Sequence, residues 1–181
     1  MKTTLAVLAV LLCIPAGAQA QRIDLDSLNR LADRADEVVN VDVDERMLRI
    51  AASFIPGTDK EQLAAKEFIT GLRGIFVRRF VFDREKAYSR DDYETIRRQL
   101  TAKNWLKMVT VEKRTAGETV DVHMWAEGDK MTGLAVLVAQ PTELTVVNIV
   151  GPIDIQKLTG LSGQFGIPDL PKIEAPDPKK E

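Results

Sequence analysis

Four apolar runs separated by short polar breaks occupy the second half of the chain, from residue 105 to residue 150. The runs are rich in Val, Leu and Met, and the breaks fall at residues 115–117, 128–130 and 141–143. Runs of this length, with a glycine or a proline in every break, are typical of strands joined by tight turns. The pattern therefore predicts an antiparallel meander of four strands.

Two further strands are predicted in the first half of the chain. Val39, Val41 and Val43 alternate with polar residues, which is the pattern of a strand with one buried face. Residues 74–82, GIFVRRFVF, are apolar on both sides of the strand apart from two adjacent arginines. A strand that is apolar on both sides needs cover on both, so we expect it in the interior of the sheet.

Apolar residues at helical spacing predict five helices, each with a capping residue or capping box at its start. The predicted helices lie at residues 27–35, 45–54, 58–72, 89–100 and 154–166. In the second of them, we expect Met47, Ile50, Ala51 and Phe54 to face the core. Two strands joined through helices and four joined by hairpins predict an α+β fold, with one mostly antiparallel sheet of about six strands and helices packed on one face.

The first twenty residues have the features of a secretory signal peptide. Lys2 precedes a continuous apolar run from Leu5 to Ile14, and the small residues Ala18 and Ala20 follow. The run is too short to cross a bilayer core of roughly 30 Å as a helix. We therefore expect cleavage after Ala20 and a location in the periplasm.

A lipid anchor is not expected at Cys13. This cysteine lies inside the apolar run, and the large residue Leu12 precedes it, whereas a lipid-modified cysteine normally follows a small residue. The mature chain then has no cysteine, which excludes disulfides, thiol catalysis and Cys-ligated metal. Residues 22–166 are expected to form a single α+β domain, and residues 167–181, rich in proline and charge, a disordered tail.

Composition and charge narrow the possible functions. The chain is 45% hydrophobic and 29% charged, as is usual for one globular domain. Removing residues 1–20 takes one base from the 25, which leaves 24 bases against 27 acids, a net charge of −3. This balance does not favour nucleic-acid binding. With one histidine and no cysteine, the mature chain predicts neither a metal site nor a cofactor.

Three segments resemble one family of bacterial secreted proteins. They are GLRGIFVRRFVFD (71–83), the strand from Trp105 to Val111, and VNIVGPIDIQKLTGLSGQFGIP (147–168). The family is known as domain of unknown function four-two-five-two, and the similarity extends from Asp36 to Pro168. The shared features are glycine turns and apolar strands. The resemblance therefore implies a related fold and an envelope location, and it carries over no catalytic residue.

The single histidine, His123, lies on the predicted strand ETVDVHMWAEG. Asp121, His123 and Trp125 share one face of this strand, while the apolar residues between them share the other. A carboxylate beside an imidazole can act as an acid–base pair, which gives a hydrolase-like enzyme as one hypothesis. The ordinary explanation is an open, solvated strand face that carries an incidental histidine. On an open face, Trp125→Ser would cost little stability.

Basic residues are concentrated between residues 73 and 114, a segment that contains twelve basic and six acidic residues. Five of them, on three successive elements, are expected to lie close together and to bind an anionic partner: Arg78, Arg79, Arg97, Arg98 and Lys107. In the alternative interpretation, the two helical arginines are the solvated side of their helix. The two strand arginines then pair with carboxylates such as Asp42 or Glu112.

The sequence thus favours a secreted envelope protein that works by binding and without catalysis. Its expected partner is an unknown envelope protein or an anionic membrane surface. The expected binding surface is the basic residues or the open strand face that carries Asp121, His123 and Trp125. Two alternatives stay open. One is the hydrolase-like enzyme that uses Asp121 and His123, and the other is a self-associating structural protein built on residues 133–139, which are apolar on both faces.

Overall fold

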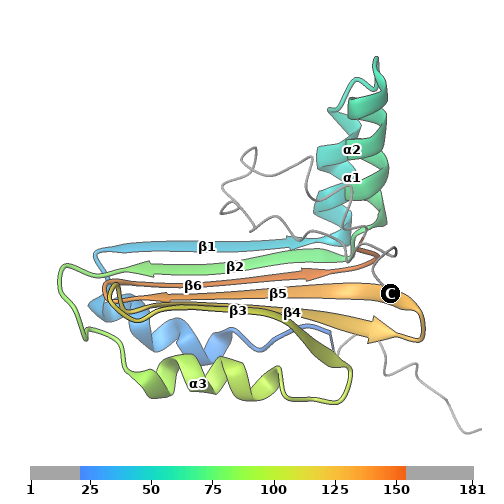
Figure 1. The fold of residues 1–181 in the computed structure, drawn as a ribbon. Helices are drawn as coiled ribbons and strands as arrows, with labels where there is room; N and C mark the ends of the chain where they lie inside the picture. Colours follow the sequence, from blue (N-terminus) through green and yellow to red (C-terminus); the bar gives the residue numbers. More distant parts are fainter. Residues whose placement is uncertain (1–20, 154–181) are drawn as a thin grey trace, which may run out of the picture.

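The computed structural model describes residues 21–153 of the chain. They form one open antiparallel sheet with the strand order β1-β2-β6-β5-β4-β3 (Figure 1). The strands are β1 (Glu37–Asp44), β2 (Gly74–Val81), β3 (Trp105–Lys113), β4 (Glu118–Glu127), β5 (Lys130–Gln140) and β6 (Glu143–Val150). The helices are η2 (Asp26–Arg34), α1 (Glu45–Ser53), α2 (Lys60–Gly71) and α3 (Arg90–Gln99).

This architecture confirms the predicted α+β fold. Strands β3 to β6 are neighbours in chain order and form the predicted meander, and β2 has the predicted interior position between β1 and β6. The N-terminal helix is also present, although it is a 3-10 helix. The predicted signal peptide, the predicted helix at residues 154–166 and the predicted tail lie outside the described residues.

Each side of the sheet carries its own apolar cluster. Helices η2 and α3 lie along one side (Figure 1), which we call the helix-covered face. Its fully buried residues include Leu28, Leu31, Phe80, Ile96 and Leu144. The opposite side, here the valine face, carries a second cluster that includes Val122, Val136 and Val147 together with Leu48 and Leu72 from the α1–α2 hairpin.

The two clusters arise because successive side chains along a strand point to opposite faces of the sheet. In β2, alternate residues are buried and partly buried, so that Phe76 and Phe80 belong to the helix-covered face while Ile75 and Val77 belong to the valine face. Strand β2 therefore contributes side chains to both apolar clusters, as expected of an interior strand that is apolar on both sides.

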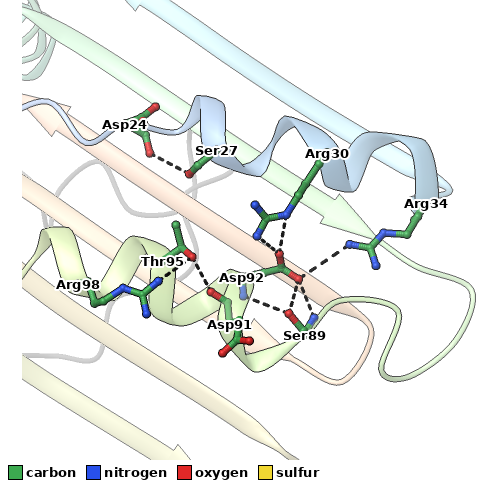
Figure 2. A network of polar contacts seen from close by, with 9 residues as sticks. All are labelled: Asp24, Ser27, Arg30, Arg34, Ser89, Asp91, Asp92, Thr95 and Arg98. Atoms are coloured by element: carbon green, nitrogen blue, oxygen red, sulfur yellow. Dashed lines mark hydrogen bonds and ion pairs between the residues drawn. The ribbon is translucent and has the colours of Figure 1, made fainter.

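A buried carboxylate joins the two helices of the helix-covered face. Asp92, 2% exposed, forms a capping box with Ser89 at the start of α3 and accepts hydrogen bonds from Arg30 of η2 (Figure 2). Arg34, at the end of η2, lies 3.9 Å from the same carboxylate. One side chain therefore completes the N-terminus of α3 and ties that helix to η2.

The helix α1 faces the core with a different side from the one predicted. Asp44 caps the helix as expected, because its carboxylate accepts a hydrogen bond from the backbone N–H of Met47. The buried residues, however, are Leu48 and Ala52. The predicted core stripe is on the outside, with exposed fractions of 50% for Met47, 52% for Ile50 and 80% for Phe54. The prediction was wrong because α1 and α2 stand away from one end of the sheet (Figure 1), so only one narrow side of α1 has a neighbour.

Candidate functional site

A buried polar cluster on the helix-covered face brings together several of the predicted site residues. Asp121 of β4 is 1% exposed, and its two carboxylate oxygens accept hydrogen bonds from the hydroxyls of Thr110 and Tyr93. Arg97 of α3 lies 3.6 Å from the same carboxylate. Strands β3 and β4 and helix α3 therefore meet at one negative charge.

The surroundings of Asp121 keep it ionised. Burial alone raises the pKa of the Asp121 carboxyl group, but hydrogen bonds from Thr110 and Tyr93, with Lys107 and Arg97 close by, outweigh it and leave the pKa below its ordinary value. Burial and the carboxylate of Asp121 together raise the pKa of Tyr93, so this phenol stays protonated and can donate its hydrogen bond. A satisfied cluster of this kind fixes α3 on the sheet.

His123 lies on the same face of β4 but does not complete an acid–base pair. Its side chain is 4% exposed, and no hydrogen bond joins it to Asp121 among residues 21–153. Nδ1 of His123 has no hydrogen-bond partner within the described part of the chain. Burial is the main cause that lowers the pKa of His123; Lys107 and Arg97 also lower it and Asp121 raises it, and the net shift is downward, so the ring is neutral near pH 7.

A cavity of about 460 Å³ opens beside this cluster, at the end of the helix-covered face where the β3–β4 and β5–β6 turns lie. Asp121, Tyr93 and Arg97 contribute to its wall, but His123 does not. The two residues of the hydrolase hypothesis therefore do not line this cavity together. The arrangement supports a structural role for Asp121 and gives no support to catalysis by the pair.

The expectation of an open face around Trp125 was wrong. Asp121, His123 and Trp125 do share one face of β4, as predicted, but all three are buried because this is the face that η2 and α3 cover. Trp125 is 6% exposed and packs edge to face against Trp105, with 5.4 Å between the ring centroids. Replacing Trp125 by serine would therefore open a large cavity in the core.

The five predicted anion-binding residues do not form one surface. Strands β2 and β3 are separated by three strands, or roughly 19 Å between their axes at the usual strand spacing. Arg78 is 6% exposed and lies 2.9 Å from Asp42, which confirms the alternative interpretation for this residue. Arg79 lies on the valine face and pairs with two glutamates, Glu37 and Glu143.

The helical pair is divided as well. Arg97 turns toward Asp121 and Glu94, whereas Arg98 is exposed and donates a hydrogen bond to the hydroxyl of Thr95 within α3. Lys107 is the cross-strand neighbour of His123 at the edge of the sheet. Of the predicted bases, Arg97 and Lys107 act on common groups, which are the buried Asp121 and its neighbour His123.

The exposed side of α1 is a feature that the sequence did not reveal. Met47, Ile50 and Phe54 follow one another at i, i+3 and i+7 along α1 and its C-cap and form an apolar stripe on the surface. Leu63 of α2 is also 50% exposed. The spacing is the same as that of a core-facing helix, so only the structure distinguishes a buried stripe from an exposed one.

Among residues 21–153, no group of three or more His, Cys, Asp or Glu side chains is placed to hold a metal ion. No helix in this part of the chain is long and apolar enough to cross a membrane.

No curated protein and no solved structure matches the chain. A family model does match residues 33–161, most of the chain, and its description is Domain of unknown function (DUF4252). The chain therefore belongs to this family, as its glycine turns and apolar strands predicted.

Proposed function

We propose that this protein is a non-enzymatic binding module that contacts its partner through the apolar stripe of the α1–α2 hairpin. The observation that carries the proposal is the exposure of Met47, Ile50 and Phe54, half or more in each case, on one side of a helix. A folded chain rarely leaves aligned large apolar side chains in water unless a partner covers them. The hairpin also stands clear of the sheet (Figure 1), which makes the stripe accessible to a large partner.

The partner that fits this surface is a protein with an apolar groove. An amphipathic helix that inserts three side chains at i, i+3 and i+7 is a common mode of protein recognition. An anionic membrane fits less well, because helices that lie on such membranes are rich in Lys and Arg on the polar side. Residues 44–71 carry four bases and five acids, so the hairpin has no excess of positive charge.

The proposal places this binding in the bacterial envelope. Its support is the start of the chain, where a short apolar run after Lys2 and before Ala18 and Ala20 has the features of a cleavable signal peptide. A periplasmic binding module needs neither a metal nor a cofactor, in agreement with the composition of the mature chain.

Site-specific photocrosslinking tests the proposal in intact cells. A photoreactive amino acid at position 50, in the stripe, should give a discrete protein adduct, whereas the same group at the exposed position 61 of α2 should not. The double variant Met47→Gln and Phe54→Gln should remove the adduct without lowering the thermal stability, because neither side chain is buried. Equal crosslinking from both positions, or adducts with lipid alone, would contradict the proposal.

A further inference from the structure

The two edge strands of the open sheet, β1 and β3, differ in how well they are protected against pairing with a further strand. An edge strand points alternate N–H and C=O groups away from the sheet, where another strand can pair with them. In β3, a register shift between Lys107 and Val109 interrupts the edge, and Lys107 and Lys113 place two positive charges along it. Bulges and lysines of this kind discourage added strands.

Strand β1 has neither a register shift nor a lysine. It pairs with β2 over eight consecutive residues, from Glu37 to Asp44, without a register shift, and it contains no lysine and no proline. No described strand pairs with its outer side. The edge of β1 is therefore a regular and accessible template for strand addition.

The side chains of β1 define what an added strand must carry. The valine face of β1 carries Glu37, Val39, Val41 and Val43. Its helix-covered face carries Val38 and Asn40, followed by Asp42 and Asp44 at the end next to α1. In a pleated sheet, side chains of neighbouring strands on one face lie about 4.5–5.5 Å apart. An added strand thus needs apolar residues on one side and residues that tolerate or neutralise carboxylates on the other.

An acidic cavity beside β1 strengthens this requirement. The cavity has a volume of about 670 Å³ and lies on the helix-covered face, at the end of the sheet opposite the Asp121 cluster. Five carboxylates and three arginines line it, a net charge of −2. Within this lining, Arg22 lies over the ring of Phe76 at 4.1 Å and Arg78 pairs with Asp42, while Glu45 pairs with Arg49 of α1. The cavity is large enough for the long basic side chain of a partner.

We propose that the edge of β1 binds an extended peptide segment as a seventh strand, and that basic residues alternate with apolar residues in this segment. The apolar residues continue the valine face, while the basic residues face the acidic cavity. The acidic residues of β1 itself make two copies of this edge repel each other, which disfavours pairing of β1 with β1 of another molecule. This surface is separate from the apolar stripe and does not depend on it.

Synthetic peptides test the strand pairing directly. An eight-residue peptide of alternating lysine and valine should bind the full chain and slow amide hydrogen exchange in residues 37–44. The same peptide with glutamate in place of lysine should bind about tenfold or more weakly, because like charges then face each other across the pair. Methylation of alternate backbone nitrogens should abolish binding in one register and spare it in the other, because only one set of N–H groups faces β1.

Two matched variants separate the edges. Val41→Lys places a positive charge on the valine face of β1, and Val111→Lys makes the same change on β3, where the valine is likewise partly buried. The first variant should weaken peptide binding about tenfold and the second should leave it unchanged. Should Val41→Lys fail to fold, the methylated peptides decide the question on the unchanged protein.

Three outcomes would overturn the proposal. One is equal binding of both methylated registers, which would mean that the peptide is held by charge alone. Another is slowed exchange in β3 instead of β1. The third is concentration-dependent self-association that the peptide reverses, because the occupant of the β1 edge would then be β3 of a second copy.

Discussion

Replacing Asp92 by alanine tests whether one buried carboxylate holds η2 and α3 together. The carboxylate accepts hydrogen bonds from the backbone N–H and the hydroxyl of Ser89, both at 2.8 Å, and from the guanidinium of Arg30. Loss of the capping box costs about 1 kcal/mol. Loss of the charge-assisted hydrogen bonds adds about 1 to 2 kcal/mol, near the low end of the usual range because the Arg30 side chain is 54% exposed and regains water.

We therefore expect Asp92→Ala to lower the free energy of unfolding by about 2 to 3 kcal/mol, measured by urea denaturation at low salt. The neighbouring residue Asp91 provides a matched control, because it occupies the same first turn of α3 but is exposed (Figure 2). Asp91→Ala should change the free energy of unfolding by about 0.5 kcal/mol or less.

The effect should also depend on pH. Burial alone raises the pKa of Asp92, but hydrogen bonds from Ser89 and Arg30 outweigh it and hold the pKa below its ordinary value. Since the folded pKa is lower than the unfolded one, the stabilisation is complete above the unfolded pKa of about 4 and is lost as the pH falls through the folded pKa. The difference between the unchanged protein and Asp92→Ala should shrink over that range. The reasoning is refuted if Asp92→Ala costs no more than Asp91→Ala, or if acid leaves the difference intact.

Three other substitutions give clear expectations. Tyr93→Phe removes one of the donors to the buried Asp121 and should lower the free energy of unfolding by about 1 to 2 kcal/mol in urea melts. Gly151 has a φ of 133°, and a Cβ at this position would lie 2.8 Å from the backbone at the end of α2. Gly151→Ala should therefore lower the melting temperature well beyond the control Gly128→Ala, whose Cβ would meet nothing within 4 Å. Burial lowers the pKa of His123, so the unfolded chain takes up a proton at a higher pH than the folded chain. The free energy of unfolding should therefore fall as the pH drops below about 6.5. Urea melts at several pH values should show a smaller fall for His123→Phe.

The strands were predictable because each is a short run of apolar or alternating residues that ends at turn residues. The meander breaks at glycine and proline, and Phe76 and Phe80 of β2 point to one side while Ile75 and Val77 point to the other. These patterns depend on local sequence and the pleat of a strand, and tertiary contacts did not change them.

The phase of α1 was not predictable in the same way. Two sides of this helix carry apolar residues at helical spacing, one with Leu48 and Ala52 and the other with Met47, Ile50 and Phe54. The larger side chains favoured the second side as the core. Which side is buried depends on where the hairpin stands relative to the sheet, and that position is set by the short connections at its base.

The prediction that the polar face of β4 is open to solvent was wrong for a related reason. A carboxylate and an imidazole on one face of a strand usually indicate contact with water, yet the carboxylate of Asp121 is satisfied by Tyr93 and Thr110, which lie 28 and 11 residues away along the chain. The five predicted anion-binding residues are dispersed because closeness in sequence does not determine strand order. Arg78 and Lys107 are on successive strands of the chain, but these strands are four positions apart in the sheet.

The pairing of β2 with β6 also has a consequence for the order in which the chain can fold as it is made. The contacts that place β2 are distant in sequence: Arg79 binds Glu143 across 64 residues, and β2 pairs with β6 from Gly74 to Val81. The meander can form from local contacts as soon as its turns exist, but the N-terminal strands wait until the last strand has emerged from the ribosome or the translocation channel. Until then, the apolar side chains of β2 remain uncovered, and a chaperone that shields them would act on this stage of the protein's life.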